Sequence, residues 1–314
     1  MTKKKTTKLP QVHPARVRYI KLGHGGGWER ECVAKGIIRI GFASGAPERF
    51  NQCRTGRWKA VAASFKRAGK TGGTATRFAN ELRLFFEDDG STLWITFAGD
   101  RLYWGSSTDV PPKPSLDGNG VWRTILGGWR CTDVNGEALT KDNLSGALTK
   151  LAAYRGTSCD VDVSDYVVRR VNGHKTPEVE RAIGARQELV AAALDLMKLL
   201  GPKDFELLVD LVFTSSGWRR LGVVGKTQKT LDLSLELPST GERAFVQVKS
   251  RTDSKELADY IEQIDDGLYR RMFFVFHSGE VETDDERVTV IGPEKLAELV
   301  ADAGLVGWLI RKVS

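Results

Sequence analysis

The stretch that decides the fold of the second half of this chain is Arg243-Ala244-Phe245-Val246-Gln247-Val248-Lys249-Ser250. Apolar and polar residues alternate along it, which is typical of a β-strand with one buried face. Successive side chains of a strand point to opposite faces, so Gln247 and Lys249 share one face while Val246 and Val248 point into the core. The strand therefore presents an amide and an ammonium group side by side.

A second apolar segment, Leu231-Asp232-Leu233-Ser234-Leu235, predicts a strand with an acid inside it. If the two strands pair, the Asp232 carboxylate meets Gln247 and Lys249 at one point. Carboxylate and amide oxygens are the hard ligands that Mg²⁺ takes, and the backbone carbonyl of Val248 can supply another. Lys249 can orient or activate a water there and stabilise the charge that develops on an attacked phosphate.

Around these two strands the pattern predicts an α/β layer architecture. A long helix over residues 178–200 ends at Gly201-Pro202, and a second helix over residues 203–213 carries Glu206, a carboxylate that can support the metal through a water. Thr176 before Pro177 is a helix N-cap signal, and we place the domain boundary beside it, after His174. The other expected elements are strands at 218–224, 231–237, 243–250, 271–277 and 288–291, and helices at 254–263 and 293–303.

Residues 201–277 resemble the Mrr-type branch of the PD-(D/E)xK restriction endonucleases. The resemblance rests on four features in order, namely Phe205-Glu206 on a helix, Gly217-Trp218 leading into a strand, Asp232, and Gln247-Val248-Lys249. This branch commonly has Gln where the wider superfamily has Glu or Asp. The resemblance implies a restriction-endonuclease-like α/β sandwich that hydrolyses DNA phosphodiesters with Mg²⁺. The chain lacks the glycine often found beside the acid, so Glu236 stays an alternative to Asp232.

The two halves of the chain differ in charge. The 314 residues carry a net charge of +7, but residues 1–174 hold 28 basic and 16 acidic residues, and residues 175–314 hold 19 and 24. Residues 51–80 contain seven Lys or Arg and no acid. Such a field attracts polyanions, so we expect the first half to bind nucleic acid. The expected contacts to the DNA backbone are Arg54, Arg57, Lys59, Lys66, Arg67 and Lys70.

The first half is expected to be a mixed domain with more strand than helix. Residues 1–16, with Lys3, Lys4, Lys5 and Lys8, are expected to form a flexible basic tail, and residues 17–174 the domain, with an extension from about residue 106. The proline-rich segment 106–120 is typical of a surface connection. Expected elements are strands at 17–22 and 36–42, a hairpin at 92–97 and 101–104, and helices at 57–68 and 143–155.

Three segments of this domain resemble the PUA-like group, which includes EVE and YTH domains. They are Gly23-His24-Gly25-Gly26-Gly27-Trp28-Glu29, Gly36-Ile37-Ile38-Arg39-Ile40-Gly41-Phe42 and Leu102-Tyr103-Trp104-Gly105. The resemblance implies a small β-barrel-like domain that holds a flipped or modified base in an aromatic pocket. Trp28, Tyr103 and Trp104 are the expected pocket residues, since stacking accepts any base and pocket shape selects the modification. Glu29 and Asp100 are both suited to read a cytosine amino group, and the sequence does not choose between them.

Other classes of function lack their motifs. The four cysteines form no CxxC pair and the four histidines no HxH or HxxxH spacing, which disfavours zinc sites, disulfide scaffolds and HNH nucleases. No Walker or Gly-x-Ser-x-Gly motif is present. The sequence has no run of about 18 apolar residues and no apolar signal segment, so we expect a cytoplasmic protein without a membrane partner.

These features predict a two-domain protein of α/β and α+β class, with a basic reader at residues 17–174 and a nuclease at residues 175–314. The expected function is that of a modification-dependent, type IV-like restriction endonuclease. It would cut double-stranded DNA with a modified base such as 5-methylcytosine or 5-hydroxymethylcytosine, and two active sites for two strands indicate a homodimer. Two alternatives remain open, a nucleic-acid-binding regulator with a silent nuclease fold and a repair nuclease that reads no modified base.

Overall fold

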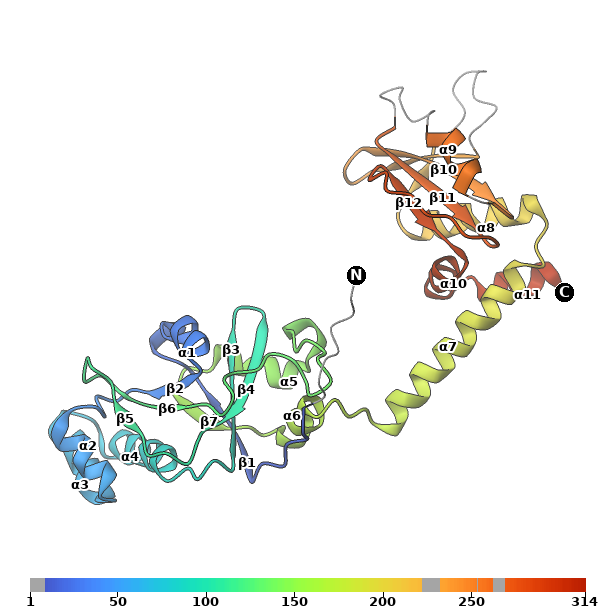
Figure 1. The fold of residues 1–314 in the computed structure, drawn as a ribbon. Helices are drawn as coiled ribbons and strands as arrows, with labels where there is room; N and C mark the ends of the chain where they lie inside the picture. The colour runs from blue at the N-terminus through green and yellow to red at the C-terminus, as the bar shows by residue number, and fades with distance from the viewer. Residues whose placement is uncertain (1–8, 222–231, 253, 262–268) are drawn as a thin grey trace. The chain divides into compact units, whose positions relative to one another are not determined.

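The computed structural model describes residues 9–221, 232–252, 254–261 and 269–314. The chain divides into two units, residues 1–175 and residues 176–314, both of which combine helices with sheets (Figure 1). The boundary expected after His174 therefore lies within one residue of the observed one. The lysines of the expected tail, Lys3, Lys4, Lys5 and Lys8, lie outside the described residues.

The first unit alternates short strands with short helices. Its elements are β1 (Arg16–Ile20), the 3-10 helix η1 (His24–Gly26), α1 (Glu29–Lys35), β2 (Ile37–Ile40), α2 (Pro47–Arg54), α3 (Trp58–Arg67), α4 (Gly72–Phe86), β3 (Thr92–Ala98), β4 (Arg101–Ser106), β5 (Lys113–Pro114), β6 (Val121–Thr124), the 3-10 helix η2 (Lys141–Asn143), α5 (Gly146–Thr149), the 3-10 helix η3 (Lys150–Ala153), β7 (Ser158–Asp160) and α6 (Ser164–Val171).

Two sheets organise this unit. The larger has the strand order β4-β3-β1-β7, in which β1 and β3 are parallel and the outer pairs antiparallel. Strand β3 is buried on both faces, because Trp94 joins one apolar cluster while Leu93 and Ile95 join another. The smaller sheet, β2-β6-β5, is antiparallel, and Ile125 after β6 forms a bridge with Ser107 after β4. The expected hairpin of β3 and β4 is confirmed, and the PUA-like barrel stays a prediction.

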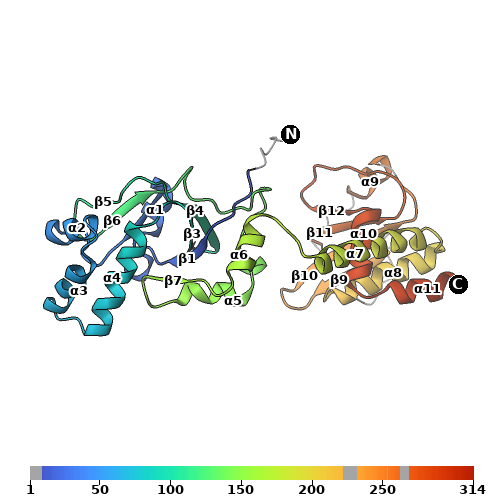
Figure 2. The same cartoon turned by 90° about the horizontal axis from the view of Figure 1, so that it is seen from below.

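Helices pack against both apolar clusters, α3 and α4 against the one with Trp94, and α5 and α6 against the one with Leu93 and Ile95. Val61 and Phe65 of α3 and Leu82 of α4 share an apolar cluster with Ile38 and Ile40 of β2. Figure 2 shows α2, α3 and α4 together at one end of the first unit, with α5 and α6 at the other end. The expected helix at 57–68 corresponds to α3. The apolar spacing did not single out α1, α2, α4 or α6.

Three expectations for the first unit are wrong. Its helices hold more of the described residues than its strands do, against the expected excess of strand. Residues 9–15 are not a free tail, since the Leu9 N–H donates to the Val134 carbonyl at 3.1 Å and the Val12 N–H donates to the Asn172 side chain at 2.8 Å. The segment 143–155 is not one helix. Leu144 is extended and the Ser145 hydroxyl accepts the Ala147 N–H, which begins a new short helix there.

The second unit is a single sheet with helices on both faces. Its elements are α7 (Pro177–Met197), α8 (Pro202–Ser215), β8 (Arg219–Arg220), β9 (Leu233–Leu237), β10 (Glu242–Lys249), α9 (Ser254–Ile261), β11 (Arg271–Phe276), β12 (Val288–Ile291), α10 (Pro293–Asp302) and α11 (Val306–Val313). These match the expected order, except that α11 was not expected. Residues 222–224 of the strand expected at 218–224, Leu231 of the next strand, and residues 262 and 263 of the helix expected at 254–263 lie outside the described residues.

The sheet of this unit has the order β12-β11-β10-β9-β8. Strands β10, β11 and β12 are parallel, while β9 and β8 are antiparallel to their neighbours. Val246 and Val248 pack with α7, α8 and α10 in one apolar cluster, as the alternation predicted. Phe245, which shares the other face with Gln247, packs with Leu257 of α9. Strand β10 thus holds its polar side chains on the α9 face. In the part of the chain that the structure describes, no helix is long and apolar enough to cross a membrane.

Candidate functional site

Asp232 and Gln247 meet where β9 and β10 pair. Leu233 is opposite Val246 in the antiparallel register, so the next residues along the pair are Asp232 and Gln247. The Asp232 oxygen Oδ2 accepts hydrogen bonds from the Gln247 side-chain nitrogen at 2.6 Å and from the Val248 backbone N–H at 2.7 Å. Strand pairing therefore places the acid beside the amide.

Lys249 lies two residues further along the same face and is held by α9. Its Nζ lies 2.7 Å from Oε1 of Glu256 and 5.1 Å from the centre of the Tyr260 ring. Burial acts to lower the pKa of Lys249, but hydrogen bonds with Glu256 and Tyr260 outweigh it and keep the pKa above its usual value. Thr252 donates its hydroxyl to the other Glu256 oxygen at 2.8 Å. Lys249 is therefore a positioned ammonium group.

The donor atoms at this point suit a hard divalent cation. Gln247 is buried, and its Oε1 has no hydrogen-bond partner among the residues that the structure describes. A buried amide oxygen without a donor is costly unless another group satisfies it. Burial also raises the pKa of Asp232, against the opposing effects of the Val248 N–H and the Lys249 charge. A cation bound to Gln247 Oε1 and to the Asp232 carboxylate would satisfy the unpaired amide oxygen and stabilise the buried negative charge.

No group of three or more His, Cys, Asp or Glu side chains gathers in the described ranges. An ion here would be held by the Asp232 carboxylate, the Gln247 amide oxygen and the Val248 carbonyl, which together form an oxygen set of the kind that Mg²⁺ takes. Such a set leaves further positions to water or phosphate oxygens.

The two other candidate acids lie apart from this cluster. Glu206 is exposed on α8 and makes no hydrogen bond or ion pair to another described residue, so no contact of the structure brings it to Asp232. Glu236 accepts a hydrogen bond from Arg243 at 3.2 Å, directly opposite it in the register. At about 3.3 Å per residue, Arg243 lies about 13 Å along β10 from Gln247. Asp232 is therefore the acid of this cluster.

Sequence reasoning missed Glu256 and Tyr260. The sequence contained a signal for them, because they are four residues apart in a helix expected directly after the strand of Gln247 and Lys249. Residues at this spacing lie on one helix face, here the face toward Lys249.

The first unit contains a cavity of about 660 Å³ with Trp28 in its wall. Gly23 has a φ of +85°, and a Cβ at this position would lie 2.9 Å from the Trp28 ring, so a glycine is needed for the indole to sit there. The Arg39 guanidinium lies 3.9 Å from the centre of this ring. The cavity is lined by Lys21, Gly23, His24, Gly25, Trp28, Gly41, Phe42, Asp117, Asn119, Arg155, Gly156 and Thr157.

The backbone at one wall of the cavity is strained. Phe42 and Ala43 have φ values of +65° and +48°, and they are the two non-glycine residues with positive φ in the described chain. The Phe42 ring stacks on Phe78 with centroids 4.2 Å apart, which holds this conformation. Strained residues of this kind cluster at ligand sites, because the surrounding structure must over-determine them.

The other two aromatic residues expected in the pocket lie elsewhere. Trp104 is 1% exposed, and its indole N–H donates to the Thr132 carbonyl at 2.7 Å, so it is a core residue and its assignment to a base pocket is wrong. Tyr103 is partly exposed on β4 and does not line the cavity. Glu29 and Asp100 do not line it either, whereas Asp117 does.

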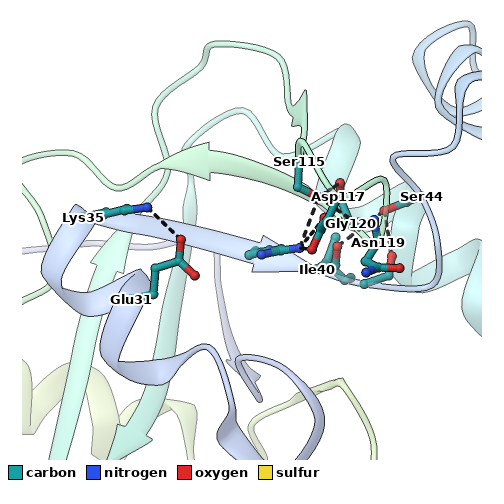
Figure 3. Close-up of polar contacts among 10 residues, drawn as sticks. Glu31, Lys35, Ile40, Ser44, Ser115, Asp117, Asn119 and Gly120 are labelled. Atoms are coloured by element: carbon teal, nitrogen blue, oxygen red, sulfur yellow. Dashed lines mark hydrogen bonds and ion pairs between the residues drawn. The ribbon is translucent and has the colours of Figure 1, made fainter.

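Asp117 belongs to the loop between β5 and β6, which is fastened to β2. Both of its carboxylate oxygens accept hydrogen bonds from Arg39 Nη2, at 2.7 and 2.6 Å, and Oδ1 also accepts the Asn119 N–H at 3.0 Å. Figure 3 shows Ser115, Asp117, Asn119 and Gly120 on this loop, close to Ile40 at the end of β2. The proline-rich connection expected at 106–120 thus forms part of the cavity wall.

The six cations expected at the DNA backbone are all exposed and lie on or beside α2 and α3. Arg67 lies 3.6 Å from Glu48 in an exposed ion pair. The other five have no acidic partner among the described residues. They are Arg54, Arg57, Lys59, Lys66 and Lys70.

Comparison of the chain with protein-family models, with curated proteins and with solved structures finds no match in any of the three.

Proposed function

We propose that this protein is a Mg²⁺-dependent endonuclease that cuts double-stranded DNA carrying a modified base, such as 5-methylcytosine or 5-hydroxymethylcytosine. The observation that carries this proposal is the cluster near the end of β10, where Gln247 donates to Asp232 and Lys249, held by Glu256, follows two residues later on the same face. The buried Gln247 oxygen without a partner can serve as a metal ligand, and the ammonium held by Glu256 can stabilise charge on a phosphate, so both groups suit metal-dependent hydrolysis of a phosphodiester.

The residues of the cluster have separate roles in the proposed reaction. Mg²⁺ bound at Asp232, Gln247 and Val248 would supply Lewis-acid polarisation of the phosphate and of a water. The Lys249 ammonium donates hydrogen bonds that orient the attacking water and stabilises the negative charge that grows on the phosphate oxygens. Because Glu256 and Tyr260 favour its charged form, Lys249 acts as a cation and a hydrogen-bond donor at neutral pH.

Glu256 is a positioning residue in this scheme. Lysine has four rotatable side-chain bonds, and the ion pair at 2.7 Å limits the positions that Nζ can take. Thr252 in turn orients the Glu256 carboxylate. A held ammonium needs less reorganisation when charge develops on the substrate.

The first unit supplies recognition. A base inside a duplex cannot reach a walled cavity, so the target nucleotide has to be extruded from the stack. Trp28 and Phe42 offer aromatic surface to the extruded base, and Lys21 and Arg155 offer positive charge to its phosphate. The exposed cations on α2 and α3 add contacts to the DNA backbone that carry no sequence information. Since each active site cuts one strand, we propose that two copies of the chain act together.

The test is the cleavage of matched plasmids that differ only in their cytosines, which are unmodified, 5-methylated or 5-hydroxymethylated. Each is incubated with Mg²⁺ and with wild type, Lys249→Ala or Lys295→Ala. Lys295 is an exposed lysine that pairs with Glu298 on α10, so its removal matches the change of charge away from the cluster. We expect wild type and Lys295→Ala to cut only a modified plasmid, and Lys249→Ala to cut none.

A second pair of variants tests the reader. Trp28→Ala removes the indole from the cavity, while Trp122→Ala removes a half-buried indole that does not line it. We expect only Trp28→Ala to lose the preference for modified DNA while still cutting with Mg²⁺. Equal cutting of all plasmids by wild type would favour a repair nuclease without a reader. Tight binding of DNA without cutting of any plasmid would favour a regulator with a silent nuclease fold.

A further inference from the structure

Asp117 lies in the wall of the Trp28 cavity, and one of its two carboxylate oxygens can accept a further hydrogen bond. Asp117 Oδ1 accepts two hydrogen bonds, from Arg39 Nη2 and from the Asn119 N–H, whereas Oδ2 accepts one, from Arg39 Nη2. A carboxylate oxygen accepts about two hydrogen bonds. The Asp117 side chain is 47% exposed, so the unused position on Oδ2 is open to a ligand.

The loop holds this carboxylate in its charged form. The Arg39 guanidinium, above all, with the Asn119 backbone N–H and the nearby Ser115 hydroxyl, keeps the pKa of Asp117 well below its usual range. The Ser115 hydroxyl itself donates to the Gly120 carbonyl. Arg39 is itself fixed, because it lies over Trp28 and its side chain is 10% exposed. Asp117 is therefore an acceptor without a proton to donate at neutral pH.

Asn119 adds a second polar group beside it. Asn119 also lines the cavity, and its side-chain amide makes no hydrogen bond to another described residue. An amide offers both a donor and an acceptor. The loop thus presents a fixed acceptor next to a group that can donate, as Figure 3 shows for Asp117 and Asn119.

We infer that Asp117 selects the base, by accepting a hydrogen bond from an exocyclic amino group while Asn119 donates to the neighbouring ring nitrogen. This inference rests on the proposed function of the cavity as a reader of modified bases. Cytosine and adenine both carry an amino group beside a ring-nitrogen acceptor, N4 beside N3 in cytosine and N6 beside N1 in adenine. Thymine and other uracil derivatives present a carbonyl oxygen in place of the amino group, and two facing acceptors repel.

The experiment compares bases that differ only in this group. Full-length Lys249→Ala protein, which does not cut in our scheme, is titrated with duplexes that carry one central modified base. The bases are 5-hydroxymethylcytosine, 5-hydroxymethyluracil, 5-methylcytosine, thymine and N6-methyladenine, with unmodified cytosine and adenine as references. Fluorescence anisotropy gives the Kd of each duplex.

We expect a modified amino base to bind about tenfold or more tightly than the uracil derivative with the same 5-substituent. Preference for a cytosine duplex or for the N6-methyladenine duplex identifies which amino base is read, and both support the inference. Equal binding of 5-hydroxymethylcytosine and 5-hydroxymethyluracil, each tighter than unmodified DNA, overturns the inference and leaves the proposed reader intact. No preference for any modified duplex over unmodified DNA overturns both.

A variant of similar shape tests the residue itself. In Asp117→Asn the amide oxygen would take the Oδ1 position, where Arg39 and Asn119 both donate, rather than Oδ2, where Arg39 alone donates. The NH₂ group then takes the Oδ2 position, and Arg39 keeps only its bond to the oxygen. A donor there repels an amino group and suits a carbonyl, so we expect the preference to fall at least about tenfold, toward 5-hydroxymethyluracil. Glu31→Gln is the control, since Glu31 pairs with Lys35 at 2.8 Å outside this cavity and loses the same charge. Unchanged discrimination in Asp117→Asn would overturn the assignment.

The comparison of duplexes with the Lys249→Ala protein needs no change in the loop, so the inference is tested even if Asp117→Asn unfolds. Thermal unfolding of Asp117→Asn and Glu31→Gln shows whether either substitution unfolds the protein.

Discussion

The Asp232 carboxylate accepts a hydrogen bond from the Gln247 side chain at 2.6 Å across the antiparallel pair of β9 and β10. This contact joins the residue before β9 to the C-terminal half of β10, and it leaves the other polar atom of the amide, Oε1, buried without a partner in the described chain. A buried acceptor without a donor destabilises the fold, so this arrangement indicates a site that a further group completes.

Asp232→Asn should reduce Mg²⁺-dependent cleavage by about a hundredfold or more, because it removes the negative charge that holds the cation. Glu236→Gln is the matched control, since it removes one acid from the same region of sheet but breaks only a half-exposed ion pair with Arg243. Its cleavage rate should stay within about twofold of wild type, since such pairs contribute little. Initial rates at the same subsaturating Mg²⁺ concentration measure cleavage by the two variants, and a greater loss in Glu236→Gln would show that the acid is misassigned.

Glu256→Gln should lower the cleavage rate about tenfold to a hundredfold, because Lys249 loses the carboxylate that positions it. The affinity for DNA should not change. In a Lys249→Ala background the same substitution should have no further effect, since it acts through Lys249. The measurement is the single-turnover cleavage rate of wild type, Glu256→Gln, Lys249→Ala and the double variant. A rate of the double variant that falls by the product of the two single losses would contradict a positioning role.

Replacing Lys59, Lys66 and Lys70 together by Ala should weaken DNA binding without changing base preference. All three are exposed on or beside α3 and have no acidic partner among the described residues, so folding should not change. The plot of log Kd against log salt should lose about one unit of slope for each lysine that contacts a phosphate. Lys295→Ala provides the control. An unchanged slope would place the DNA on another surface.

Glu81→Gln should make the stability of the first unit less dependent on pH. Glu81 is 7% exposed, and burial raises its pKa, although hydrogen bonds from Ser158 and the charges of Arg77 and Arg18 oppose this. The folded state therefore binds a proton more tightly than the unfolded state, and stability falls as the pH rises from the ordinary value of 4.5 through the raised one. A glutamine has no such proton to lose.

Urea unfolding at pH 4 and pH 7 should thus show the variant gaining stability relative to wild type as the pH rises. The opposite trend would mean that the ion pair of Glu81 with Arg77 and its hydrogen bonds from Ser158 outweigh its loss of hydration.

The sequence by itself determined the strands of the second unit and the residues that share a face on them. The alternation along Arg243–Ser250 placed Gln247 and Lys249 together, and the apolar segment around Asp232 predicted the neighbouring strand, as the register confirms. The domain boundary and the uneven charge were likewise readable. These features are local, because the period of two and the helix start signal are properties of a few consecutive residues.

Only the tertiary structure decided which distant groups meet. Trp28 follows a glycine and Trp104 precedes one, yet Trp28 lines a cavity while Trp104 is buried in the core. Asp117 reached the cavity wall because Arg39, 78 residues away, holds its loop. Glu256 became the partner of Lys249 because α9 packs on the polar face of β10. Such contacts depend on the packing of whole elements against one another, and packing is not encoded in the spacing of neighbouring residues.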